Sequence, residues 1–100
     1  MNVSKYTLSP NAASSIADIK AFTVSKFGPR QAQRYIENLR DCFNFLVEHP
    51  ELGTNRDEVK AGYHNFIEGS HTIYYKIIGG RIVIMDILRQ SMEPKRHLND

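Results

Sequence analysis

Histidine and basic side chains in the second half of the chain are the groups best suited to proton transfer and charge stabilisation. The set comprises Lys60, His64, His71, Lys76, Arg81, Arg89 and His97. Histidine changes protonation near neutral pH, and lysine and arginine stabilise developing negative charge. Each histidine also has a structural explanation, since His64 and His71 flank a predicted turn and His97 lies in a tail expected to be mobile. We therefore expect structural or solvated roles for the histidines, and keep catalysis as the alternative.

Metal and cofactor chemistry find little support in the sequence. No pair of histidines has a recognised ligand spacing and the carboxylates are scattered, so we expect neither a metal site nor a cofactor. Cys42 is the single cysteine, which excludes an internal disulfide and a multi-cysteine zinc site. Its place between Leu39 and Phe43 in an apolar helical pattern predicts a buried thiol.

Length and composition predict a small globular protein of the cytoplasm. With 100 residues, the chain is long enough for one domain, 1–100, and too short for two. A hydrophobic share of 41% supports a packed core, while a net charge of +2 leaves the chemistry of any partner open. Residues 1–6 lack the apolar core of a signal peptide, and no apolar run approaches the ~20 residues of a membrane helix. We expect neither export nor membrane insertion.

Two helices follow a short N-terminal strand in the predicted order. Residues 3–8 mix β-branched and aromatic side chains and end at Ser9-Pro10, a typical helix start. Apolar residues then recur at helical spacing over 10–27 and 29–48, with Gly28-Pro29 between the two runs. Because this link is so short, we expect the helices to pack antiparallel as a hairpin.

Three strands complete the predicted fold. Residues 63–68, 71–78 and 81–89 are separated by Gly69-Ser70 and Gly79-Gly80, two-residue links that favour tight hairpins. The last strand is apolar at most positions, which indicates a central strand covered on both faces. The order is therefore β-α-α-β-β-β, an α+β fold with the helical hairpin packed on one face of a three-stranded antiparallel meander. We expect the opposite, concave face to carry the function.

Five segments extend this pattern to a family resemblance. They are YTLSPNA at 6–12, FGPRQAQRY at 27–35, HPELGTNRDEV at 49–59, GYHNFIEGSHTIYYKI at 62–77 and IVIMDILRQSMEPKRHL at 82–98. In this order and at these spacings, the chain resembles the ParE toxins of the ParE/RelE superfamily of type II toxin–antitoxin systems over almost its whole length. The resemblance implies a small toxin silenced by a ParD-like antitoxin, whose C-terminal segment lays a helix in the groove of the helical hairpin.

Apolar side chains in excess of one packing face agree with such a groove. Tyr35 and Phe45 widen the stripe of the second predicted helix beyond the needs of a two-layer core. A helix bound in a groove would cover them, although a wide core stripe is an equally good explanation. The residues expected to bind the antitoxin are Ile19, Phe22, Tyr35, Leu39 and Phe45.

The resemblance leaves two targets to be distinguished. RelE-like members cut messenger RNA on the ribosome and place a tyrosine near the C-terminal end, whereas ParE-like members trap the cleaved complex of DNA gyrase with DNA. No tyrosine follows Tyr75 here, and ILRQSME at 87–93 resembles the ParE pattern. We therefore expect a gyrase poison without bond chemistry of its own. The residues expected to meet gyrase are Arg56, Lys60, Arg81, Arg89, Met92, Lys95, Arg96 and His97.

Two alternatives stay open at this point. The histidines and basic residues keep a ribosome-dependent endoribonuclease of the RelE type possible. His64 and Gln90 stand where ParE-like sequences often carry a basic residue, which suggests a weakened toxin or a non-toxic module that retains only antitoxin binding.

Overall fold

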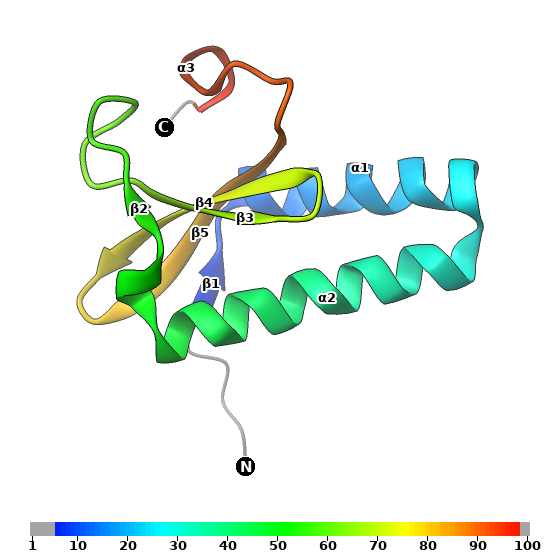
Figure 1. Ribbon diagram of the computed structural model, residues 1–100, viewed down its shortest axis with the longest axis horizontal. Coiled ribbons are helices and arrows are strands. Elements are labelled where there is room, and N and C mark those ends of the chain that lie inside the picture. Colours follow the sequence, from blue (N-terminus) through cyan, green and yellow to red (C-terminus); the bar gives the residue numbers. More distant parts are fainter. Residues whose placement is uncertain (1–5, 99–100) are drawn as a thin grey trace.

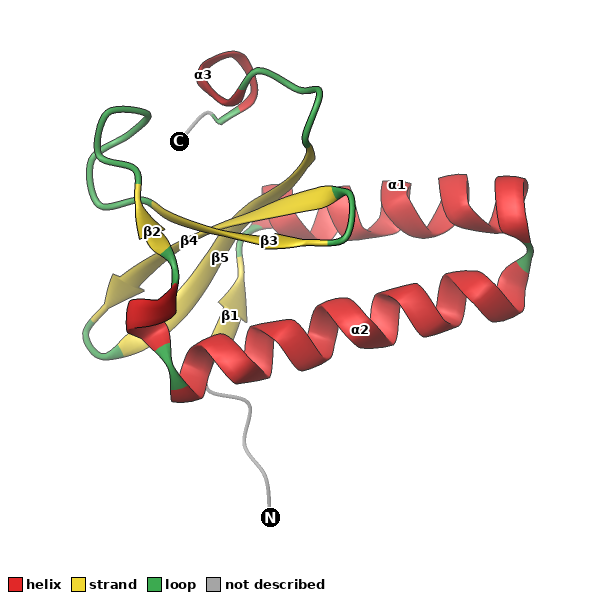
Figure 2. Ribbon diagram, viewed as in Figure 1, coloured by secondary structure: helices red, strands yellow, loops and turns green. Residues whose placement is uncertain are grey.

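The computed structural model describes residues 6–98 as a five-stranded mixed sheet with two long helices (Figures 1 and 2). The strand order is β1-β5-β4-β3-β2, in which β1 pairs with β5 in parallel and the other neighbours are antiparallel. The elements in chain order are β1 (Tyr6–Leu8), α1 (Pro10–Phe27), α2 (Pro29–Glu48), the 3-10 helix η1 (Pro50–Leu52), β2 (Thr54–Asn55), β3 (His64–Glu68), β4 (His71–Ile78), β5 (Arg81–Arg89) and α3 (Pro94–His97).

The predicted α+β order is confirmed, with helices at the expected bounds. Of the predicted strand 3–8, residues 6–8 form β1 and residues 3–5 lie outside the described part of the chain. The expected strand 63–68 begins at His64. The sequence did not predict η1, β2 or α3, which span two to four residues each and are too short to show a periodicity.

Ser9 fixes the start of α1 against the sheet. Its Oγ accepts a hydrogen bond from the Ala12 amide at 3.0 Å as an N-cap and donates one to the Met85 carbonyl at 2.6 Å. Its own amide donates to the Ile84 carbonyl at 2.9 Å. Helix α1 therefore leaves the β1–β5 pair at a set position, and Gly28, with φ of 92°, then reverses the chain into α2.

The main core lies between the helical hairpin and one face of the sheet. Fully buried members from α2 and the sheet are Leu39, Phe43, Leu46, Ile73, Tyr75 and Ile84. Cys42 belongs to this core, as predicted, and burial, with a smaller contribution from Glu68, raises the pKa of its thiol to about 11. The thiol is thus protonated at neutral pH.

A second, smaller core covers part of the opposite face of the sheet. Tyr74 and Tyr75 are adjacent in β4 and so face opposite ways, and only Tyr75 belongs to the main core. The second core comprises Tyr63, Tyr74, Leu88 and Leu98, with Val59, Met85 and Met92 packed against it. This finding corrects one expectation. The tail near His97, expected to be mobile, forms α3 and is anchored by Leu98, which is 6% exposed.

A β-bulge interrupts the pairing of β4 with β5. Tyr74 pairs with Asp86 and Tyr75 with Ile84, so Met85 is an additional residue on β5. Asp86, just after the bulge, is 6% exposed, and its Oδ1 accepts hydrogen bonds from Ser15 Oγ at 2.5 Å and from the Ile87 amide at 2.8 Å. Burial raises the pKa of this carboxyl, although the two hydrogen bonds and His97 oppose the shift.

The connection between α2 and β3 is held by the hydroxyl of Tyr75. This Oη donates a hydrogen bond to the Pro50 carbonyl at 2.6 Å and accepts one from the Gly53 amide at 2.9 Å. The ring lies so close to Gly53 that a Cβ there would stand 2.1 Å from the hydroxyl oxygen. Only glycine fits beside the fully buried Tyr75.

Gly53→Ala is expected to lower the free energy of unfolding by about 1–3 kcal/mol, because the added methyl group displaces the ring of Tyr75 from a close-packed core. Urea unfolding followed by circular dichroism measures the change. Ser14→Ala on the exposed face of α1 serves as the control and is expected to stay within about 0.5 kcal/mol of wild type. Equal stability of both variants would contradict the close packing at Gly53.

Asp86→Asn is expected to remove a pH-dependent loss of stability. The folded-state pKa of Asp86 is raised, so the native state holds a proton that the unfolded state has already lost. The stability of the wild type therefore falls as pH rises above about 4 and passes the raised pKa. Asparagine keeps an acceptor for Ser15 and carries no charge. Between pH 4 and 8, the free energy of unfolding should depend less on pH in the variant than in the wild type. An equal dependence on pH in both proteins would show that the pKa of Asp86 is not raised in the folded state.

Candidate functional site

Two adjoining cavities of about 430 and 300 Å³ form one groove beside the helical hairpin. The first is lined by Phe22, Thr23, Phe27, Gln31, Arg34, Tyr35, Asn38, Ser70 and His71, and the second by Ser15, Asp18, Ile19, Phe22, Ser70, His71, Ile87, Arg89 and Met92. Because three residues line both cavities, we treat them together as the hairpin groove. The lining residues come from α1, from α2, from the β3–β4 turn with the first residue of β4, and from the end of β5 with the segment after it.

Exposed aromatic side chains mark the walls of the hairpin groove. Phe22 is 52% exposed and Phe27 is 56% exposed, although both belong to the helical hairpin that covers the main core. Ile19, Ile87 and Met92 add apolar surface at the β5 end. Contiguous apolar surface of this kind on a small protein marks a place where another molecule binds.

The floor of the hairpin groove is a hydrogen-bonded pair. Tyr35 Oη lies 2.5 Å from His71 Nδ1 and 3.4 Å from the Glu68 carbonyl. Burial lowers the pKa of His71, and the positive charge of Arg89 lowers it further, while burial raises the pKa of Tyr35. The imidazole is therefore neutral at neutral pH. In its Nε2-protonated tautomer, Nδ1 accepts from the Tyr35 hydroxyl; in the other tautomer, Nδ1 donates to Oη and the hydroxyl donates to the Glu68 carbonyl. His71 and Arg89 are direct partners across β4 and β5, so their side chains share one face of the sheet.

The residues expected to bind an antitoxin are divided by the structure. Ile19, Phe22 and Tyr35 all line the hairpin groove. Leu39 is wrong as a surface residue, because it is fully buried in the main core. Phe45 is 45% exposed but lies near the other end of α2, where its ring contacts His49 and Phe66.

The residues expected to meet a target lie in three places. Arg89 and Met92 line the hairpin groove. Arg81 begins β5, eight residues from Arg89, which at strand spacing places the two ~26 Å apart. The two arginines therefore lie at opposite ends of β5.

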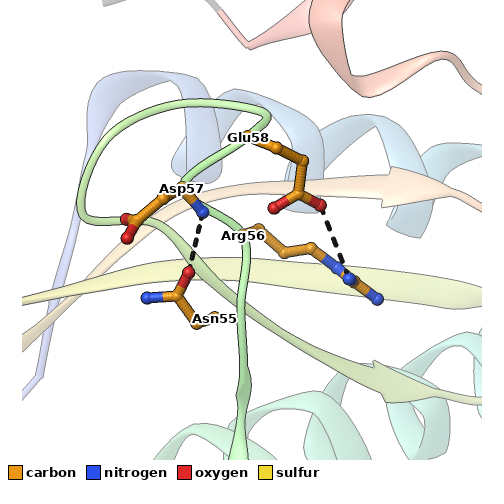
Figure 3. A network of polar contacts seen from close by, with 4 residues as sticks. All are labelled: Asn55, Arg56, Asp57 and Glu58. Atoms are coloured by element: carbon orange, nitrogen blue, oxygen red, sulfur yellow. Dashed lines mark hydrogen bonds and ion pairs between the residues drawn. The ribbon is translucent and has the colours of Figure 1, made fainter.

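The remaining expected target residues gather around the second core. Lys95, Arg96 and His97 form most of α3, and Lys60 Nζ donates to the carbonyl of Leu98 at 3.5 Å. In the loop that carries Lys60, Asn55 Oδ1 accepts from the Asp57 amide at 3.0 Å and Arg56 pairs with Glu58 at 3.5 Å (Figure 3). The loop and the tail thus present their basic side chains from neighbouring, ordered backbone.

The candidate acid–base groups are not brought into one site. His64 stacks on the core residue Tyr75, with ring centroids 5.4 Å apart, and Lys76 lies over Tyr63 of the second core at 5.8 Å. His71 and Arg89 are together in the hairpin groove, remote from both. Within residues 6–98, no three His, Cys, Asp or Glu side chains gather in a way that would hold a metal ion. No helix of the described chain combines the length and apolar character needed to cross a membrane.

Comparison with known proteins assigns the chain to a family. The family model of the ParE toxin of type II toxin-antitoxin system, parDE, matches residues 6–94. The chain belongs to this family. Toxin ParE1 of Mycobacterium tuberculosis (strain CDC 1551 / Oshkosh) is 33% identical over 96 residues, covering 95% of this chain and 98% of that protein. Toxin ParE1 of Caulobacter vibrioides is 33% identical over 93 residues, covering 93% and 96%.

A solved structure confirms the fold of this ParE-family chain. The chromosomal ParDE toxin–antitoxin system from P. aeruginosa contains a chain that superposes with a TM-score of 0.73 at 18% identity, covering 85% of this chain and 94% of that chain. The sequence-based resemblance to ParE toxins is thereby confirmed.

Several residues of the hairpin groove were not predicted from the sequence. Gln31, Arg34 and Asn38 recur on one face of α2, but a polar stripe of this kind is indistinguishable from an ordinary solvated helix face in a sequence. His71 was expected to have a structural role beside a turn, with catalysis as the alternative, and was not predicted to line a groove. Its contact with Tyr35 joins residues 36 positions apart, which no local pattern could predict.

Tyr35→Phe is expected to shift the pKa of His71, because it removes the hydroxyl that lies 2.5 Å from Nδ1. A titration of the histidine ring protons by nuclear magnetic resonance measures the shift. Tyr74→Phe, in the second core, is the control and should leave the titration of His71 unchanged. A His71 pKa that is identical in the wild type and in Tyr35→Phe would show that the contact with the hydroxyl does not influence the titration of this ring.

Proposed function

We propose that the chain is a gyrase poison that binds and traps the cleaved gyrase–DNA complex. We further propose that a ParD-like antitoxin neutralises it by laying an amphipathic segment in the hairpin groove. Both gyrase and such antitoxins act in the cytoplasm, so we propose a cytoplasmic location. Membership of the ParE family supports a role as the toxin of a toxin–antitoxin system. The hairpin groove supports neutralisation by a bound antitoxin segment.

The observation that carries the antitoxin site is the exposure of Phe22 and Phe27. More than half of the surface of each residue is accessible in the absence of a partner. Full burial of a phenylalanine side chain stabilises by about 1.5–3 kcal/mol, so covering both would contribute much of the affinity of a bound helix. The groove between α1, α2 and the β3–β4 turn offers the elongated apolar surface that such a helix requires.

The placement of Arg89 and Met92 supports neutralisation by direct masking. Both residues were expected to meet gyrase, and both line the hairpin groove next to Ile19 and Phe22. An antitoxin segment bound there would cover them. Masking then needs no change in the conformation of the toxin.

The basic residues around the second core are the proposed gyrase-facing surface. Helix α3 carries Lys95, Arg96 and His97, and Lys60 of the β2–β3 loop donates to the carbonyl of Leu98 at its end. The same loop carries Arg56. Such a surface can meet acidic protein or DNA phosphates, which are both present in the cleaved complex. The dispersal of the acid–base candidates supports binding over catalysis, since a nuclease needs them converged on one phosphate.

Addition of the purified protein to gyrase and plasmid DNA is expected to block supercoiling and accumulate cleaved DNA. The double variant Lys95→Glu/Arg96→Glu should need about tenfold more protein for the same effect, because rim charges govern association with a charged target. Lys20→Glu on the exposed face of α1 makes the same kind of charge change and should resemble wild type.

Two other outcomes would replace the proposal. Unchanged supercoiling together with cuts in translated messenger RNA would favour a RelE-like nuclease. Unchanged supercoiling, intact messages and normal growth on induction would indicate a module that only binds antitoxin.

A further inference from the structure

We propose that the antitoxin segment in the hairpin groove is acidic, and that one of its carboxylates binds Arg89 while its apolar side chains pack on Phe22. This inference rests on the proposed function, because it requires an antitoxin in the groove. It adds the chemistry of the occupant, which the apolar walls alone do not specify.

The hairpin groove contains two arginines, Arg34 and Arg89. Arg34 lines the cavity that also contains Phe27, and Arg89 lines the cavity that contains Ile87. Neither arginine forms an ion pair with any of residues 6–98. Asp18 lines the Arg89 cavity without reaching its guanidinium within ion-pair distance. The groove therefore combines exposed apolar walls with unpaired positive charge at each end, and an acidic amphipathic helix complements both.

Arg89 is the better placed of the two arginines. Its strand position is fixed opposite His71, and the Tyr35 hydroxyl occupies Nδ1 of that ring. Arg89 is exposed at the groove wall, so its guanidinium is accessible to a carboxylate of a bound segment. The guanidinium fork also allows two parallel hydrogen bonds to one carboxylate.

His71 gives the interaction a second readout. The charged groups around it are Arg89 from β5, Glu68, its partner on β3, Arg34 from α2 and Asp18 from α1. The titratable hydroxyl of Tyr35 on α2 contacts its Nδ1. The charge of Arg89 contributes to the lowered pKa of His71, and a bound carboxylate would offset that charge. Binding then raises the pKa of His71 and takes up protons, so affinity increases as pH falls toward the histidine range.

Nucleic acid fits this groove less well than an acidic helix. A strand of DNA or RNA requires a continuous track of cations along its phosphates. The groove instead has two separated arginines, a carboxylate at Asp18 and a neutral floor at Tyr35 and His71.

The test measures binding of the antitoxin encoded beside the toxin gene to full-length toxin variants. Arg89→Gln is expected to weaken binding about tenfold, the loss of one charge-assisted hydrogen-bonded contact. It should also reduce the decline of affinity between low salt and about 0.3 M salt. Arg40→Gln, on the exposed face of α2 and outside the groove lining, is the matched control and should bind within about twofold of wild type.

A double-mutant cycle identifies the partner. Each acidic residue of the antitoxin segment is changed in turn to its amide. The change at the carboxylate that binds Arg89 should weaken binding to wild-type toxin but cause no further loss of affinity for Arg89→Gln. Unfolding curves confirm that Arg89→Gln folds normally. If it does not, Arg89→Lys replaces it and should retain part of the salt dependence while losing the two-pronged contact.

The outcomes separate the two levels of proposal. Tight antitoxin binding that is equal for Arg89→Gln and Arg40→Gln overturns the acidic anchor and leaves the proposed function standing. Absence of antitoxin binding to the wild type overturns the proposed function itself. Loss of DNA binding in Arg89→Gln with unchanged antitoxin affinity overturns the anchor in favour of nucleic acid in the groove.

Discussion

The short parallel pair of β1 with β5 is the constraint on which the arrangement depends. It ends where Leu8 pairs with Ile84, and the hydrogen bonds of Ser9 to Ile84 and Met85 then direct α1 away from the sheet. Beyond Ile84, β5 therefore has α1 at its side. A longer β1 would have occupied this edge as a strand. The hairpin groove exists because the last residues of β5 meet a helix at this edge.

The sequence predicted the elements that local chemistry specifies. Proline and glycine at the helix ends and the two glycine-bearing turns fix α1, α2 and the β3–β5 meander within about one residue. The sequence could not predict what depends on distant partners. The pair of residues in β2 forms only because β3 lies beside it, and α3 is held by Leu98 in a core assembled from four segments.

The predicted site was correct only in part, for a physical reason. An apolar stripe on a helix indicates which residues are favourable to bury. It does not distinguish residues that pack in the core from residues that are buried only when a partner binds. Leu39 and Phe22 looked alike in the sequence, and their exposed fractions are 0% and 52%. Polar groove residues such as Arg34 and Asn38 are identified only by the cavity around them.

The bulge at Met85 places the side chains of Arg81 and Arg89 on opposite faces of β5. The two arginines stand eight residues apart, and an even spacing in a regular strand places both side chains on the same face. The additional residue reverses the alternation half-way along β5, so Ile87 and Arg89 join the hairpin side on which Ile82 and Ile84 already lie. Deleting Met85 would join Ile84 directly to Asp86 and keep Arg89 opposite His71, whereas regular pairing that included Met85 would turn Arg89 out of the groove and Leu88 into it. The bulge thus decides which charges the groove holds.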